Sequence, residues 1–127
     1  MSARILMVED ETAVANELSQ FLMRRGHRVT PASNGGEAME RLADAAFDLV
    51  ITDIRMPGLD GRSLIARLQA ATTAPPIIVV TGQIDYEPEG NGAAAPTVLR
   101  KPVSLRELDR TIRGILTDQR NGAEGHD

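Results

Sequence analysis

The sequence predicts an α/β fold, in which a single doubly wound, five-stranded parallel sheet has helices on both faces. Two observations predict it. Short apolar runs alternate along the chain with amphipathic segments, and this order produces parallel strands joined by right-handed helical crossovers. The runs are apolar at successive positions rather than at every second one, as in strands buried on both faces. A length of 127 residues fits one domain.

Five runs along the chain predict the strands, and the second run is the weakest. The predicted strands are Ile5–Val8, Arg28–Ala32, Leu49–Ile51, Ile77–Val80 and Val98–Leu99. Pro31 lies within the second run, and its nitrogen cannot donate a hydrogen bond to a neighbouring strand. We therefore expect that strand at an edge of the sheet.

Four segments carry apolar residues at the spacing of one helical face. These apolar stripes begin at Val14, Ala38, Leu64 and Leu105. Gly26 stands where a left-handed residue would end the first helix. Asp60 and Ser104 are expected to cap the third helix and the last helix at their starts.

The segment between the fourth and fifth strands breaks the alternation. Residues 83–96 include two prolines, two glycines and an asparagine, which oppose a regular helix. We expect the fourth helix to be short or irregular there. The domain is expected to span residues 1–120, with a polar, disordered tail over 121–127.

Composition excludes several classes of function. The net charge is −4, from 14 basic and 18 acidic residues, which is poor for nucleic-acid binding. The absence of cysteine excludes disulfides and thiolate metal sites. The chain enters a strand-like run almost at once and contains no long apolar stretch. We therefore expect a cytoplasmic protein with no membrane segment.

Chemically useful side chains stand where the predicted strands end. In an open parallel sheet, function lies beyond the carboxyl ends of the strands. Glu9 and Asp10 follow the first strand, Asp53 follows the third, Thr81 ends the fourth and Lys101 follows the fifth. The fold is expected to gather them at one edge of the sheet.

This set of residues favours phosphoryl chemistry with a metal ion. Glu9, Asp10 and Asp53 would repel one another unless a cation lay among them. Carboxylates completed by water suit Mg²⁺. Lys101 suits a phosphoryl group, and a carboxylate can attack phosphorus to form an aspartyl-phosphate. The Thr81 hydroxyl would then donate to a phosphoryl oxygen.

Each residue also has an ordinary interpretation. An acidic pair after a strand is usually a solvated loop, and Asp53 precedes a Pro-Gly turn sequence. Thr81 suits a strand end, and Lys101 suits a surface position before a helix. Each ordinary interpretation is more common in isolation, but their occurrence together at four strand ends favours a functional site.

Four pieces of the sequence resemble the receiver domain of two-component response regulators. They are Val8–Glu11, Asp48–Gly61, Val80–Gly82 and Leu99–Pro102. The resemblance extends from about Arg4 to Leu116, and the second piece is the most specific. It implies a flavodoxin-like fold with the strand order 2-1-3-4-5.

The resemblance also implies roles for single residues. Asp53 becomes the phosphoryl acceptor, and its donor is a phosphohistidine of a sensor kinase or phosphotransfer protein, or a small phosphodonor. Asp10 holds Mg²⁺ directly and Glu9 holds it through water, with the backbone carbonyl of Arg55 as a further ligand. The only expected catalysis is weak self-phosphorylation and slow self-dephosphorylation.

Further implied roles concern the switch. Thr81 supplies the switch hydroxyl, and Lys101 contacts the phosphoryl group and precedes a cis peptide bond to Pro102. Arg55 and Gln83 stand two residues past Asp53 and Thr81, where the family tunes the lifetime of the phosphorylated state.

The sequence departs from the family at two places. The family usually has an aromatic residue three positions before the lysine, but this chain has Val98. The second departure is the 83–96 segment. We hypothesise that the protein signals by ordering or moving that segment, and the alternative is a static, irregular loop.

Two other functions compete with the switch on the sequence alone. A pseudo-receiver would be an interaction scaffold without phosphorylation, but the complete set of site residues argues against it. A Mg²⁺-dependent phosphohydrolase would need a carboxylate where Arg55 stands. The sequence indicates no DNA-binding or catalytic domain after Ile115, so we expect output through contacts with a downstream protein. Whether the chain is a stand-alone regulator, a phosphate sink in a relay, or a module of a larger regulator or hybrid kinase stays open.

Overall fold

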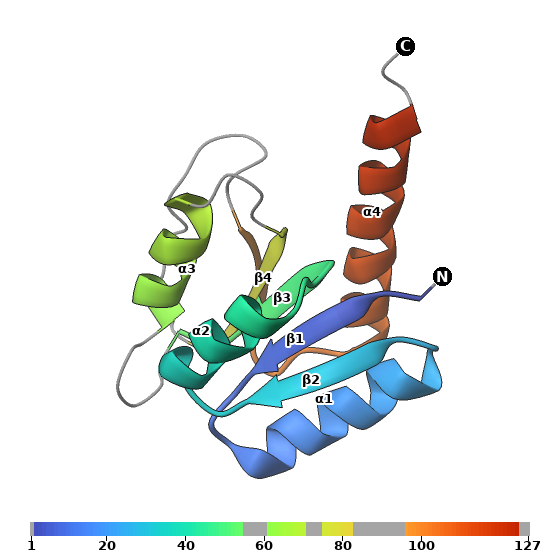
Figure 1. The fold of residues 1–127 in the computed structure, drawn as a ribbon. Helices are drawn as coiled ribbons and strands as arrows, with labels where there is room; N and C mark the ends of the chain where they lie inside the picture. The colour runs from blue at the N-terminus through green and yellow to red at the C-terminus, as the bar shows by residue number, and fades with distance from the viewer. Residues whose placement is uncertain (1, 55–60, 71–74, 83–95, 125–127) are drawn as a thin grey trace.

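The computed structural model describes residues 2–54, 61–70, 75–82 and 96–124. In chain order the elements are β1 Arg4–Val8, α1 Thr12–Arg24, β2 Arg28–Ala32, α2 Gly35–Asp44, β3 Leu49–Thr52, α3 Gly61–Ala70, β4 Ile77–Thr81, β5 Thr97–Arg100 and α4 Leu105–Glu124 (Figure 1). Every predicted strand is present, and most extend one residue beyond the apolar run that predicted them.

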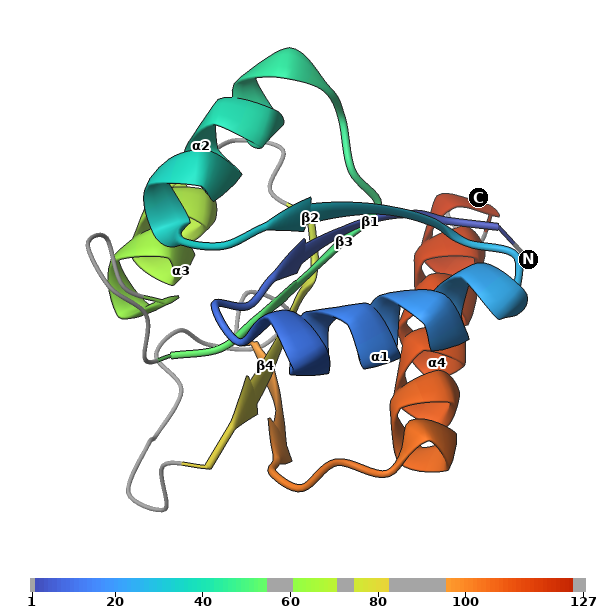
Figure 2. The same cartoon turned by 90° about the horizontal axis from the view of Figure 1, so that it is seen from below.

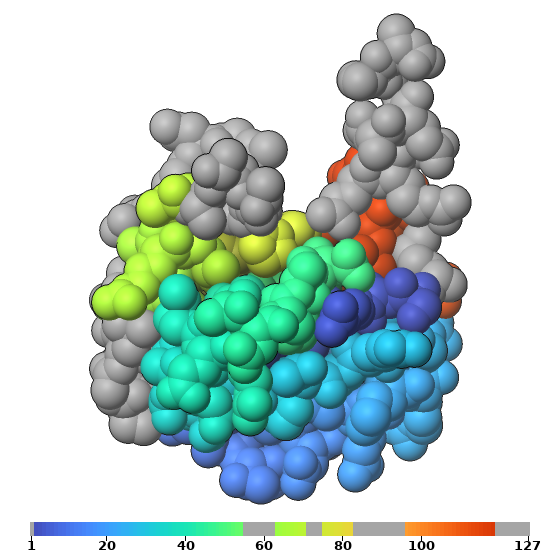
Figure 3. All heavy atoms as spheres, in the orientation of Figure 1, coloured from blue at the N-terminus to red at the C-terminus, as the bar shows by residue number. Residues whose placement is uncertain are grey.

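The strands form one parallel sheet in the order β2-β1-β3-β4-β5, as the resemblance implied. β2 lies at an edge, which confirms the prediction from Pro31. Seen from a second direction, α2 and α3 cover one face of the sheet, and α1 and α4 cover the other (Figure 2). In the space-filling view, α1 (light blue) forms the lower edge of the side turned to the viewer, with β2 and α2 above it (Figure 3).

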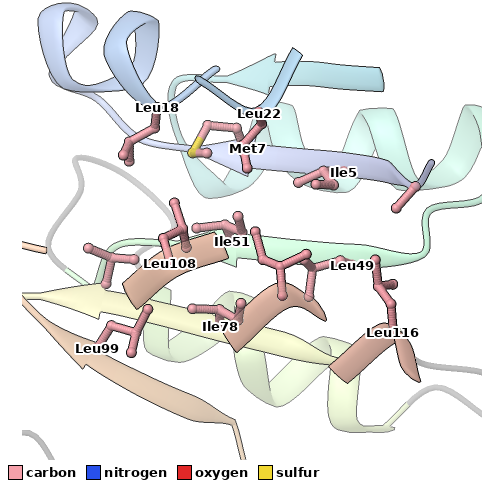
Figure 4. Packing of buried hydrophobic residues seen from close by; sticks show 13 residues of the cluster. Ile5, Met7, Leu18, Leu22, Leu49, Ile51, Ile78, Leu99, Leu108 and Leu116 are labelled. Carbon is pink, nitrogen blue, oxygen red and sulfur yellow. The ribbon is translucent and has the colours of Figure 1, made fainter. Parts of the chain in front are cut away.

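The core consists of two apolar clusters, one on each face of the sheet. Leu49 and Ile51 of β3 belong to the cluster under α1 and α4, while Val50 belongs to the cluster under α2 and α3. This alternation follows from the two-residue period of side chains along a strand. Figure 4 shows the first cluster, in which Leu18 and Leu22 of α1 approach β1. Each face of the sheet is therefore covered by its own buried apolar cluster.

Local signals set several helix ends. Gly26 adopts φ 93° after α1, and its amide donates to the Met23 carbonyl at 3.0 Å. Ser104 Oγ accepts from the Glu107 amide at 2.9 Å, which confirms the cap of α4. The predicted cap at Asp60 lies outside the described residues. Asn34 caps α2 by accepting from the Glu37 amide at 2.8 Å, a cap that the sequence analysis missed.

Two further expectations concern the 83–96 segment and the C-terminal tail. The irregular fourth helix, over 83–96, lies almost wholly outside the described residues. The disordered tail was expected from residue 121, but α4 continues to Glu124. Once a helix exists, each further residue adds a hydrogen bond at little cost, so a polar sequence can extend it. None of the helices described by the structure is long and apolar enough to cross a membrane.

Candidate functional site

The acidic residues lie together because β1 and β3 are neighbours in the sheet. Val8, the last residue of β1, pairs with Thr52, the last residue of β3. Glu9 and Asp53 come directly after these partners, so both stand at the same end of the sheet. The Asp53 amide donates to the Val8 carbonyl at 3.2 Å, which fixes the backbone of the predicted acceptor against β1.

Three carboxylates converge at this end. Glu9, Asp10 and Asp53 each offer an oxygen, and these oxygens lie within 4.8 Å of one another. Glu9 and Asp53 are buried, at 5% and 8% exposure, whereas Asp10 is exposed. The donors are all hard oxygens, and the exposed Asp10 can also contact water, a combination that fits Mg²⁺.

Lys101 reaches the same cluster from β5. Its Nζ lies 2.9 Å from Asp53 Oδ2 and 3.3 Å from Glu9 Oε1. Its backbone amide donates to the Thr81 carbonyl at 2.8 Å, which fixes the lysine beside the end of β4. The peptide bond from Lys101 to Pro102 is cis, as the resemblance implied. One positive charge therefore stands among the carboxylates.

Burial and charge act against each other on these groups. Burial raises the pKa of Glu9, although the Glu11 amide and Lys101 both favour its ionised form. Burial acts to lower the pKa of Lys101, but its hydrogen bond to Asp53 and the charges of Asp53 and Glu9 outweigh burial and raise that pKa. Glu9 thus holds its proton more tightly than an ordinary glutamate does, while the lysine stays protonated.

Of the other predicted site residues, two lie in the described part of the chain and two lie outside it. Thr81 is buried at the end of β4, between β3 and β5 in the sheet. Val98 pairs with Val79 and packs, half-buried, against the cluster under α2 and α3. Arg55 and Gln83 lie outside the described residues. The site residues that are described therefore lie at or just after the ends of β1, β3 and β4, and within or just after β5.

Sequence reasoning missed two residues that touch the acceptor. Ile54 donates its amide to Asp53 Oδ1 at 2.6 Å, and the Thr52 hydroxyl donates to the Asp53 carbonyl at 2.8 Å. A threonine at the end of an otherwise apolar run was the available signal for the second contact.

Comparison with known proteins identifies the family. The family model of the response regulator receiver domain matches residues 5–113. The chain belongs to this family. The receiver domain described here is 36% identical, over 91% of its length, to the transcriptional activator protein PfeR of Pseudomonas aeruginosa, of which it covers 38%. It is also 36% identical to the response regulator MprA of Mycobacterium ulcerans, covering 91% of this chain and 51% of MprA.

Solved structures agree with the fold of this receiver domain. A signal receiver domain of an HD domain-containing protein from Pseudomonas fluorescens superposes with a TM-score of 0.84 at 26% identity, covering 95% of this chain and 99% of that one. TrrA from Thermotoga maritima, solved in complex with Mg²⁺–BeF, gives a TM-score of 0.79 at 29% identity, covering 88% and 97%. The receiver domain spans from about a quarter to a half of the length of its curated relatives.

Proposed function

We propose that this receiver domain is a switch that accepts a phosphoryl group from a phosphohistidine onto Asp53, with Mg²⁺ bound by the neighbouring carboxylates. One observation carries the proposal. The Nζ of Lys101 lies 2.9 Å from Asp53 Oδ2, at the place where three carboxylates offer oxygens within 4.8 Å of one another. A nucleophilic carboxylate, a set of metal ligands and a fixed cation are the parts that phosphoryl transfer to aspartate requires.

The chemistry follows from the position of each side chain. A carboxylate oxygen of Asp53 attacks phosphorus, so a P–O bond forms while the P–N bond to the donor imidazole breaks. Lys101 faces the charge that gathers on the phosphoryl oxygens. Asp10 and Glu9 would hold Mg²⁺, with the Arg55 carbonyl proposed as a further ligand, and the bound ion would neutralise charge on the phosphoryl group. Thr81 would donate its hydroxyl to a phosphoryl oxygen.

The proposed output is protein contact. Thr81 and Lys101 are joined by a backbone hydrogen bond between β4 and β5. Movement of Thr81 toward a phosphoryl group would therefore act on β5, and on the 83–96 segment that joins the two strands. Val98 replaces the usual aromatic reporter, so we propose that this segment transmits the signal to a downstream protein, while Arg55 and Gln83 set the lifetime.

Intact mass measurement after incubation with acetyl phosphate and Mg²⁺ tests the proposal. Wild type is expected to gain one phosphoryl group and Asp53→Asn to gain none, because an amide cannot serve as the nucleophile. Asp118→Asn is the matched control, since Asp118 is exposed on α4, away from the carboxylate cluster.

The opposite result has a defined meaning. If neither wild type nor the control gains a phosphoryl group with any of several small donors, the switch is excluded and a scaffold without phosphorylation replaces it. Rapid continuous release of phosphate from added monoesters would instead favour a phosphohydrolase.

A further inference from the structure

Thr52 is a buried polar residue that the proposed chemistry does not use. It ends β3 and its side chain is fully buried, at 0% exposure. In the sheet it pairs with Val8 of β1 and with Val79 of β4. Both valines belong to the apolar cluster under α2 and α3. Paired residues project from the same face of a sheet, so Thr52 stands in a row between two valines.

Packing gives no reason for a hydroxyl at this position. Valine has nearly the same shape as threonine, and both suit a strand equally. A buried hydroxyl costs free energy unless it makes a hydrogen bond. The Thr52 hydroxyl makes one to the carbonyl of Asp53, at 2.8 Å. The hydroxyl of Thr52 is thus hydrogen-bonded to the backbone of the predicted acceptor.

The peptide between Asp53 and Ile54 is held at both of its polar atoms. Thr52 binds its carbonyl, and its amide donates to Asp53 Oδ1 at 2.6 Å. Because a peptide unit is planar, fixing the direction of the carbonyl also fixes the direction of the amide. Ile54 is buried in the same apolar cluster and restrains the unit from its other end. Thr52 therefore controls where the donor to Oδ1 points.

We propose that Thr52 is a positioning residue for Asp53. Its hydroxyl holds the peptide whose amide retains Oδ1, and this leaves Oδ2 turned toward Lys101 at 2.9 Å. Attack on phosphorus is sensitive to such placement, because small displacements of a reacting atom slow a reaction strongly. This inference rests on the proposed role of Asp53 and requires no contact between Thr52 and the donor or metal.

The test compares Thr52→Val, which keeps the shape and removes the hydroxyl, with Thr52→Ser, which keeps the hydroxyl. Phosphorylation by acetyl phosphate with Mg²⁺ is expected to slow about three- to tenfold in Thr52→Val. Thr52→Ser is expected to stay within about twofold of wild type, since the hydrogen bond remains. Without donor or metal, hydrogen exchange of the Ile54 amide should become faster in Thr52→Val only.

A second amide separates positioning from general loosening. The Val50 amide donates to the Pro76 carbonyl at 3.0 Å, in the same strand. Its exchange should be unchanged in Thr52→Val, whereas a merely weakened β3 would expose both amides. Should Thr52→Val not fold, Thr52→Ala removes the same hydroxyl with a smaller side chain.

Three results would overturn the proposal. They are a wild-type rate in Thr52→Val, equal slowing in Thr52→Val and Thr52→Ser, and unchanged exchange at Ile54 in Thr52→Val. If wild type itself takes up no phosphoryl group, the proposed function fails, while the exchange at Ile54 still decides whether Thr52 holds the Asp53 peptide.

Discussion

Lys101 is the only lysine in the sequence, and it lies between Asp53 and Glu9. The remaining basic residues are all arginines. An ammonium group is a compact charge whose three donors can contact two carboxylates, whereas a guanidinium is a planar fork. The ammonium group meets the geometry found here, in which two separate carboxylates face one nitrogen. Its being the only lysine also allows its reactivity to be measured without interference from other lysines.

The raised pKa of Lys101 predicts slow reaction with acylating reagents. Only the neutral amine reacts, and Asp53 favours the protonated form through its hydrogen bond and charge. At pH 8 we expect Lys101 of Asp53→Asn to be acylated several-fold faster than Lys101 of wild type, with the α-amino group as internal reference. Equal rates measured by peptide mass would contradict the assigned ion pair. The stability that Lys101 contributes is present below its unfolded pKa and is lost only as the pH rises through its folded pKa.

His27 predicts a loss of stability in mild acid. Its Nδ1 accepts from the Ala3 amide at 3.1 Å, which requires an unprotonated nitrogen. Burial lowers the pKa of His27 from its ordinary value near 6.5, and Arg25 and Arg113 act in the same direction against Asp109. The unfolded chain then takes up a proton before the folded chain does, so stability falls as the pH drops from about 7.5 through 6.5.

Thermal unfolding at pH 7.5 and 5.5 checks this prediction. Wild type should lose more stability over that interval than His27→Gln, which keeps an acceptor but does not titrate. An equal loss in the two proteins would show that other groups cause the acid sensitivity.

At the scale of elements, polar contacts fix where helices begin and how they meet. α1 and α4 cover the same face, and Arg25, just after α1, binds both carboxylate oxygens of Asp109 in α4. Arg113 binds the same carboxylate from one turn further along α4. These groups are partly exposed, so their contribution to stability is small.

The start of α2 gives a prediction at this scale. Asn34 accepts from the Glu37 amide, while Glu37 accepts from the Ser33 amide at 2.7 Å. Two amides at the helix start are satisfied reciprocally, much as in a capping box. Asn34→Ala is expected to cost about 1 kcal/mol of unfolding free energy. Asn16→Ala, at an exposed position within α1, is the control in denaturant titration and should cost nothing. Equal effects would exclude the cap.

For the whole molecule, stability comes from the two apolar clusters on either side of the sheet. The chain has three aromatic residues, and the largest fully buried side chains are those of isoleucine, leucine, valine and methionine residues. Such a core depends on close packing of many small contacts rather than on a few large rings. Glu9 and Asp53 are buried charged groups, and burying charge opposes folding. The two apolar clusters must therefore supply the stability that holds these groups in place.

Two adjacent residues of α1 test this dependence. Leu22 is fully buried in the cluster under α1 and α4, whereas Met23 is 52% exposed. Leu22→Ala is expected to cost about 2–5 kcal/mol, a large part of the stability of an ordinary domain. Met23→Ala should change it by less than about 0.5 kcal/mol. Similar losses in chemical denaturation would contradict the assigned core.

The elements, and the chemistry available at their ends, follow from local sequence patterns. Continuous apolar runs predict buried strands, Pro31 predicts an edge, and Glu9, Asp53 and Lys101 were predicted at one end of the sheet. These predictions succeed because periodicity and backbone chemistry act over a few residues.

Tertiary structure alone decided which of these groups touch. Lys101 binds Asp53 from 48 residues away and Glu9 from 92 residues away. Thr52 lies between two valines because β3 lies between β1 and β4. His27 becomes a buried acceptor through packing beside Ala3. Such contacts depend on strand order and register, which bring distant residues together and which no local pattern encodes.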